Sequence, residues 1–156
     1  MPVKPVPDGY LATPYLIVKS AAKAIDFYRK AFGATEIMRF TDPSGGTAHA
    51  EIKIGMAPVM LADEHVAMGY KSPEVYGGTP VSIVLYTENV DALFNQAVAA
   101  GASVERAVAD QFYGDRNGTL KDPFGHVWTL VTHVEDVSPE DMQKRMAEMM
   151  EKGHAS

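Results

Sequence analysis

Two stretches of the chain decide its fold. Residues 13–34 read TPYLIVKSAAKAIDFYRKAFGA, and residues 80–102 read PVSIVLYTENVDALFNQAVAAGA. Each begins with a β-branched and aromatic run typical of a strand and continues with apolar residues at helical spacing. Each then ends in Gly-Ala, where glycine is the usual stop of a helix. The strands match at an offset of 69 residues and the Gly-Ala stops at an offset of 68, which indicates an internal repeat.

Three strand-like segments follow each of these helices, so that each half reads strand, helix, strand, strand, strand. The first half spans about residues 11–63 and the second about residues 80–133. Between them, residues 64–79 are polar and contain glycines, which favours a linker or a mobile lid. The predicted strands after the helices are residues 36–40, 47–54 and 58–62 in the first half, and residues 103–107, 116–121 and 126–132 in the second.

A last helix is predicted over about residues 138–152. It begins with Ser138-Pro139-Glu140-Asp141, which resembles a capping box with proline at the first helical position. Its methionines fall on one face, and methionine faces adapt to varied surfaces. Two interpretations stay open: the helix packs on its own domain, or it covers a partner subunit or the mouth of a cavity. The methionines are Met142, Met146, Met149 and Met150.

The bulk composition indicates one domain, residues 1–156, and narrows the function classes. Hydrophobic residues make up 46% of the chain and charged residues 22%, which is ordinary for a globular protein. Without cysteine, a disulfide framework and zinc sites that need sulfur are excluded. The net charge of −6 and the absence of a dense Lys/Arg run argue against nucleic acid, and no apolar run is long enough for a membrane span. We expect a cytoplasmic protein with a small-molecule partner, and neither nucleic acid nor membrane as partners.

Strand parity singles out an acid/base pair on residues 47–54. Alternate residues face opposite sides of a strand, so Ala48, Ala50, Ile52 and Ile54 are expected to pack under a helix. His49, Glu51 and Lys53 then lie on the other face. A carboxylate beside an imidazole fixes its tautomer and makes an acid/base pair, so His49 and Glu51 are candidate catalytic residues. The alternative is the outward polar face of an antiparallel strand.

The same parity predicts an apolar and aromatic cavity wall with scattered hydroxyl groups, which suits a flat or semi-polar organic ligand. The alternative is a face filled by its own side chains. Together with His49 and Glu51, the residues predicted to bind a ligand from this wall are Thr13, Tyr15, Met60, Ser82, Tyr86 and Thr129.

The loop at residues 110–116, DQFYGDR, adds three candidate ligand contacts. Phe112 and Tyr113 could stack on a planar ligand. Arg116 could clamp a carboxylate or phosphate, or it could pair with Asp115 or Asp110 and brace the loop. The residues alone leave both roles of Arg116 open.

The sequence resembles the glyoxalase/bleomycin resistance/extradiol dioxygenase group, also called the vicinal oxygen chelate superfamily. The two repeat stretches and DPFGHVWTLVTH (residues 122–133) carry the resemblance, which covers roughly residues 11–150. Within the group it is similar to the PhnB-like branch, through HAEIKIG, DQFYGDRNGTLKDPFGHVW and HVEDVSPEDM. The resemblance implies an α+β fold: two βαβββ repeats form a paired, curved mixed sheet with helices outside. It also implies a cavity within the chain or, with swapping, between chains, and a homodimer.

Metal-dependent members of the superfamily hold a divalent ion with His, Glu and sometimes Gln on the first and last strands of each repeat. The matching positions here are Thr13, Met60, Ser82 and Thr129, and none is a good ligand for such an ion. We therefore expect no metal and no cofactor. Three functions stay open: metal-free binding or sequestration of a small organic molecule, a lyase or isomerase using His49 and Glu51, and a metalloenzyme with those two residues at a shifted site.

Overall fold

The computed structural model describes residues 2–154, and it confirms the two βαβββ repeats. Each predicted strand and helix is present, with shifts of a few residues at the ends. The predicted first strand is shorter than expected, because Thr13 and Pro14 precede it. In the first repeat the elements are β1 (Tyr15–Val18), α1 (Ala21–Phe32), β2 (Thr35–Thr41), β3 (Thr47–Ile54) and β4 (Ala57–Asp63); in the second they are β5 (Ser82–Tyr86), α3 (Val90–Ala100), β6 (Ser103–Asp110), β7 (Asp115–Lys121) and β8 (Val127–His133).

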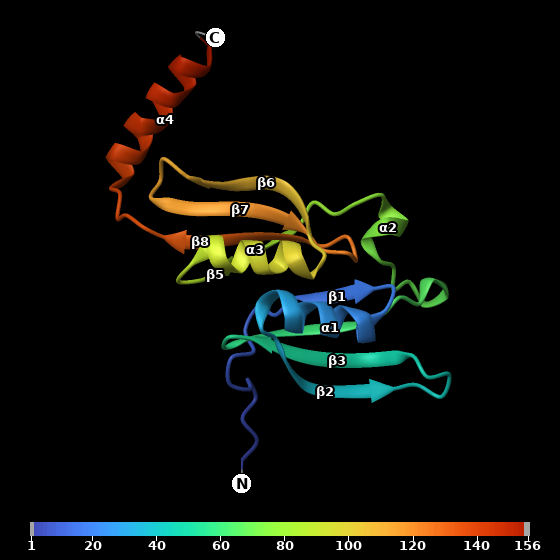
Figure 1. The fold of residues 1–156 in the computed structure, drawn as a ribbon. Coiled ribbons are helices and arrows are strands. Elements are labelled where there is room, and N and C mark those ends of the chain that lie inside the picture. Colours follow the sequence, from blue (N-terminus) through green and yellow to red (C-terminus); the bar gives the residue numbers. More distant parts are fainter. Residues whose placement is uncertain (1, 155–156) are drawn as a thin grey trace.

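Each repeat forms its own four-stranded mixed sheet, in the order β1-β4-β3-β2 and β5-β8-β7-β6 (Figure 1). β1 runs parallel to β4, and β5 runs parallel to β8, while the remaining pairs are antiparallel. Tyr15 pairs with Met60 in one sheet, and Val84 pairs with Thr129 in the other. Because both residues of the second pair lie 69 positions after those of the first, the registers confirm the repeat.

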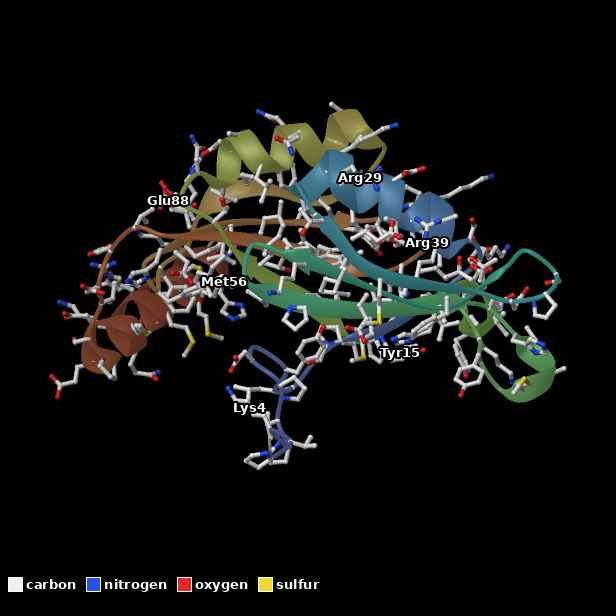
Figure 2. All side chains as sticks on the ribbon, turned by 90° about the horizontal axis from the view of Figure 1, so that it is seen from below. Lys4, Tyr15, Arg29, Arg39, Met56 and Glu88 are labelled. Atoms are coloured by element: carbon white, nitrogen blue, oxygen red, sulfur yellow. The ribbon has the colours of Figure 1, made fainter. Side chains whose placement is uncertain are left out.

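Helices α1 and α3 cover the same side of the two sheets, and the segment before β1 lies on the opposite side (Figure 2). Helix α1 is capped by Ser20 and stopped by Gly33 in a left-handed conformation, as the sequence predicts. Its apolar face, with Ile25 and Tyr28 at its centre, packs with α3 into one core that also holds Trp128. We call the opposite side of each sheet its open face.

A buried carboxylate joins the two repeats. Asp122, in the turn before β8, accepts hydrogen bonds from the Tyr28 hydroxyl of α1 at 2.5 Å and from the Trp128 indole at 2.9 Å. Burial and the Asp122 charge hold the pKa of Tyr28 well above its ordinary value. Nearby, the His126 imidazole lies 3.0 Å from the Ile17 carbonyl. The repeats are thus joined by hydrogen bonds as well as by apolar packing.

The segment between the repeats has more structure than the expected linker. It holds a short 3-10 helix, η1 (Val66–Met68), and one helical turn, α2 (Pro73–Tyr76). The buried backbone of Ser72 donates to the Glu64 carboxylate, and Glu74 pairs with Lys19. The Ser72 bond closes the segment on itself, and the Lys19 pair holds it against the first repeat.

Helix α4 (Pro139–His154) does not pack on its own domain, which corrects one of the two sequence interpretations. It extends away from the sheets (Figure 1), and none of its residues is buried. Its anchor is near its start, where Arg145 pairs with Glu135 and donates to the Phe112 carbonyl. Within residues 2–154, no helix is both long and apolar enough to cross a membrane.

A bulge corrects one detail of the predicted β3 parity. Ala50, Ile52 and Ile54 are buried under the helices as expected, but Ala48 is exposed. Phe40 pairs with His49 and Thr41 with Thr47, so the register passes over Ala48 and leaves it outside the regular pleat.

Candidate functional site

A chain of four hydrogen-bonded side chains lies on the open face of the first sheet. The Tyr10 hydroxyl donates to Oε2 of Glu51. The other oxygen, Oε1, lies 3.1 Å from Nε2 of His49, and Nδ1 of His49 lies 2.9 Å from the Tyr15 hydroxyl. We call Tyr10, Glu51, His49 and Tyr15 the tyrosine–histidine network. The structure therefore brings together three residues that the sequence predicted, and adds Tyr10.

The charge state of Glu51 determines how protons are arranged along this network. The hydrogen bond from Tyr10, and after it the hydrogen bond and the charge of His49, hold the pKa of Glu51 below its ordinary value, although burial opposes this. An ionised Glu51 can only accept, so His49 donates a hydrogen bond from Nε2, and an imidazole with that one proton accepts a hydrogen bond from the Tyr15 hydroxyl at Nδ1. Burial, with smaller contributions from Tyr70 and Glu51, raises the pKa of Tyr15, so its hydroxyl keeps its proton at neutral pH.

Tyr10 could not be identified from the strand pattern, because it lies in the proline-rich segment before β1. A turn at residues 7–10, closed by a hydrogen bond from the Tyr10 backbone to the Pro7 carbonyl, brings it to the sheet. The only signal in the sequence was the Asp8-Gly9 turn, and Gly9 has the positive φ of 83° that such a turn requires.

Apolar side chains surround the network. Phe40 stacks against the His49 ring with centroids 6.3 Å apart, and the Tyr15 ring lies 5.4 Å from it. Met38, Glu51, Met60 and Tyr15 form one row across the sheet in successive strand pairs. The open face thus combines a buried carboxylate, an imidazole and an exposed hydroxyl with aromatic and thioether groups.

The equivalent row of the second sheet contains different chemistry. Arg106, Thr119, Thr129 and Val84 occupy the positions of Met38, Glu51, Met60 and Tyr15. Thr129, predicted as a ligand contact, lies 3.0 Å from the Thr119 hydroxyl. The acid/base pair of the first sheet therefore has no counterpart in the second.

The remaining predicted contacts, apart from Thr13, lie on or near this second sheet. Ser82 and Tyr86 are exposed on β5. Phe112 and Tyr113 meet edge to face, and the Tyr113 hydroxyl accepts a hydrogen bond from Asn117. Thr13 precedes β1, and its hydroxyl lies 3.4 Å from the Leu11 carbonyl. The predicted residues thus fall into two groups, one on each sheet.

Arg116 is held by carboxylates. Its guanidinium makes two bonds of 2.8 Å to Asp91 at the start of α3 and one of 3.2 Å to Asp110. This arrangement favours the bracing role over the ligand clamp, with Asp91 as a partner that the sequence pattern did not identify.

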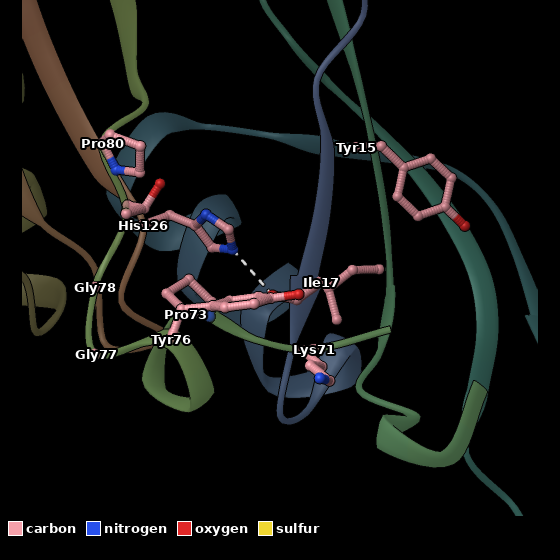
Figure 3. Close-up of a pocket in the computed structure, with 10 residues that line it drawn as sticks. Tyr15, Ile17, Lys71, Pro73, Tyr76, Gly77, Gly78, Pro80 and His126 are labelled. Carbon is pink, nitrogen blue, oxygen red and sulfur yellow. Dashed lines mark hydrogen bonds between the residues drawn. The ribbon is translucent and has the colours of Figure 1, made fainter. Parts of the chain in front are cut away.

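Two hollows open beside β1, where the repeats meet. One, of about 740 Å³, is lined by Ile17, Tyr76 and His126 among others, and Tyr76 points from α2 toward Ile17 (Figure 3). The other, of about 510 Å³, lies between β1 and β5. Tyr15 borders both. The Tyr15 ring points away from the hollow beside α2 (Figure 3), and its hydroxyl lies with His49 on the open face of the first sheet.

The residues present do not fit the metal centre of metal-dependent relatives. Of the two rows, only Glu51 is a ligand that a hard divalent ion prefers, and its neighbour His49 is the second donor. In the part of the chain that the structure describes, no three His, Asp or Glu side chains gather closely enough to hold an ion. The side chains of the two rows therefore do not form a metal centre of that kind.

Comparison with known proteins agrees with this geometry. The model of the glyoxalase/bleomycin resistance protein/dioxygenase superfamily matches residues 9–130. The chain belongs to this superfamily. An uncharacterized protein of Mycobacterium bovis is 46% identical over 138 residues, which is 86% of this chain and 91% of that protein.

Two solved structures share the fold. Protein PA1353 from Pseudomonas aeruginosa superposes with a TM-score of 0.65 at 25% identity, covering 79% of this chain and 97% of that one. The PhnB protein from Bacillus cereus gives a TM-score of 0.61 at 19% identity, covering 77% and 97%. At such identities the likeness shows a shared fold only. A shared fold does not determine the reaction, because one fold can host varied chemistry.

Proposed function

We propose that this superfamily member binds a small organic molecule on the open face of its first sheet. The tyrosine–histidine network supplies the polar contacts, and the neighbouring aromatic and thioether side chains supply the apolar ones. One observation carries the proposal. The buried carboxylate of Glu51 is hydrogen-bonded to the half-buried imidazole of His49, and this imidazole is hydrogen-bonded to the hydroxyl of Tyr15, a residue that is 47% exposed. A few oriented polar groups within an apolar surface are typical of ligand sites.

A thermal-shift screen of planar and semi-polar organic compounds tests this function. A ligand at a hundredfold excess over its dissociation constant stabilises the fold by about 2.7 kcal/mol. The compounds that raise the melting temperature are then tested on Tyr15→Phe, which removes the terminal hydroxyl. The control is Tyr76→Phe, which lies in the hollow beside α2. We expect weaker binding to Tyr15→Phe alone; equal binding to Tyr15→Phe and wild type would contradict the site.

The order of groups in the network favours one alternative, a lyase or isomerase. Tyr15 could take a proton from the ligand while its own proton passes to His49 Nδ1, and the carboxylate of Glu51 would stabilise the resulting imidazolium. Returning that proton to another atom of the ligand would complete an isomerisation. In this case His49→Ala retains binding but loses turnover, measured as exchange of the ligand proton with deuterium from D₂O.

We also propose that two copies of the chain pair over their open faces. Large apolar side chains are exposed there, including Phe40 at 59% on the first sheet and Val84 at 54% on the second, and burying such side chains between two copies would remove them from water. Sedimentation equilibrium should give twice the chain mass, and a mass of one chain at micromolar concentration would contradict the pairing. A cytoplasmic location and the absence of nucleic-acid and membrane partners stay predictions.

A further inference from the structure

One arginine stands apart on the open face of the second sheet. Arg29, Arg39, Arg116 and Arg145 each pair with a carboxylate. Within residues 2–154, the Arg106 guanidinium has no carboxylate within 4.0 Å. Its charge is therefore not neutralised by the protein, although the chain carries a net charge of −6.

Neutral groups hold this guanidinium in place. Its Nη2 donates to Oδ1 of Asn117 at 2.8 Å and to the Thr119 hydroxyl at 3.3 Å. Asn117 is only 3% exposed, and its own amide nitrogen donates to the Tyr113 hydroxyl at 2.7 Å. The Asn117 oxygen thus accepts from Arg106 and the Asn117 nitrogen donates to Tyr113, so this buried amide orients both side chains.

The remaining hydrogen-bonding capacity of the cluster consists mainly of donors. A guanidinium has five N–H groups, and the Nε and Nη1 protons of Arg106 are not used in the two bonds above. The Tyr113 oxygen accepts from Asn117, which leaves its own proton to donate. Thr119 and Thr129 share one hydrogen bond, so one of their two protons also remains. Unused donors around a positive charge suit a negatively charged oxygen ligand.

A bulge in β6 contributes to this placement. The register of β6 against β7 shifts between Arg106 and Ala109. Val108 therefore lies close to Gly118 on the helix side, 2.9 Å from where a Cβ of that glycine would be, while Arg106 reaches Asn117 and Thr119 on the open face. Without the shift, Arg106 and Val108 would share a face, because residues two apart on a regular strand point to the same side.

We propose that Arg106, Tyr113 and the Thr119–Thr129 pair form a binding site for a small oxyanion, a carboxylate or a phosphoryl group of an organic ligand. Asn117 is a positioning residue that orients Arg106 and Tyr113 from beneath. The site goes beyond the binding function proposed above, because it lies on the second sheet and shares no residue with the tyrosine–histidine network.

Titration with methylphosphonate and with benzoate, at constant ionic strength, tests the site and distinguishes the two anion classes. Binding is followed by NMR through the side-chain signals of Arg106 and Asn117 in the full chain. The variant Arg106→Gln removes the charge, while Arg29→Gln removes an arginine of α1 that is already paired with Asp26. Because a hydrogen bond to a charged group is lost, we expect at least a roughly tenfold weaker affinity in Arg106→Gln and little change in Arg29→Gln.

The outcomes separate this site from the one on the first sheet. Binding of either anion that shifts Asn117 and weakens in Arg106→Gln supports the inference, whatever the compound screen finds. Two results would overturn it: no shift at Asn117 up to about 50 mM of either probe, a concentration far above typical dissociation constants of ligand sites, or equal affinity in Arg106→Gln and wild type. Neither result would affect the proposal for the tyrosine–histidine network, whose test uses Tyr15→Phe.

Discussion

Replacing Asp122 with asparagine should destabilise the chain more than any comparable change in a surface turn. Oδ1 of Asp122 accepts from the backbone N–H groups of Phe124 and His126 at 2.9 and 3.0 Å. The amide oxygen of asparagine can keep these two bonds. Its NH₂ group then faces the Trp128 indole, which is itself a donor, and the Tyr28 hydroxyl, which loses its acceptor.

The magnitude follows from leaving these buried donors unsatisfied. Each unsatisfied donor costs about 1–3 kcal/mol, so we expect a loss of about 3 kcal/mol in the free energy of unfolding. For a chain of this size that corresponds to a fall of roughly 6–12 °C in melting temperature. Chemical denaturation measures the loss in the free energy of unfolding, and calorimetry measures the fall in melting temperature.

Asp42 offers a matched control, since its turn has the same Asp-Pro-x-Gly pattern. Its Oδ1 accepts from the backbone N–H groups of Ser44 and Gly46 at 2.8 and 2.9 Å, at the same spacing as in the Asp122 turn. It has no buried tyrosine or tryptophan partner among the described residues. Asparagine keeps such a turn, so Asp42→Asn should cost under about 1 kcal/mol. Equal losses of stability in the two variants, or wild-type stability in Asp122→Asn, would show that the hydrogen bonds of Tyr28 and Trp128 to Asp122 do not stabilise the fold.

Three further predictions concern other parts of the chain. Gly118→Ala should cost about 1–3 kcal/mol by denaturation, because a Cβ there would lie 2.7 Å from Phe94 and 2.9 Å from a methyl group of Val108. The same substitution in a Val108→Ala background is the control, and an equal loss there would refute the steric cause. Tyr10→Phe should raise the pKa of Glu51, since its hydroxyl is the main cause of the lowering; the carboxyl carbon of Glu51 in a ¹³C NMR titration reports it, and an unchanged midpoint would contradict the network. Glu51 stabilises the fold above its ordinary pKa of 4.5, and that contribution is lost as the pH falls through its lowered folded value. Asp136 and then Asp115 raise the pKa of His133 above 6.5, so its contribution is complete below 6.5 and lost as the pH rises through the raised value; an NMR titration midpoint at or below 6.5 would contradict this.

The sequence was sufficient to predict the repeat, because helix stops, turns and strand parity are local signals. The Gly33 and Gly101 stops and the β3 strand have the predicted bounds. The pair His49–Glu51 was also predictable, because residues two apart on a strand are neighbours on one face. The internal repeat and the alternation of side chains along a strand are enough for these predictions.

The rest depends on contacts between distant segments. Tyr10 reaches Glu51 across 41 positions, and Asp91 reaches Arg116 across 25, with no local pattern to indicate either. Arg106 resembled an ordinary charged residue on an edge strand, and only the bulge beside it places it with Asn117. The methionine face of α4 fits helical spacing, yet spacing alone did not determine which surface it meets.

The most direct test of the proposed binding site is the state of the His49 imidazole with and without a bound compound. Long-range ¹H–¹⁵N NMR distinguishes Nδ1 from Nε2 and reports which of them carries the proton. We predict a proton on Nε2 in the free protein. When a compound from the thermal-shift screen is added, the Nδ1 signal of His49 should move while the signals of the exposed His133 stay unchanged. A compound that stabilises the chain while both His49 nitrogen signals stay in place would show that ligands bind elsewhere.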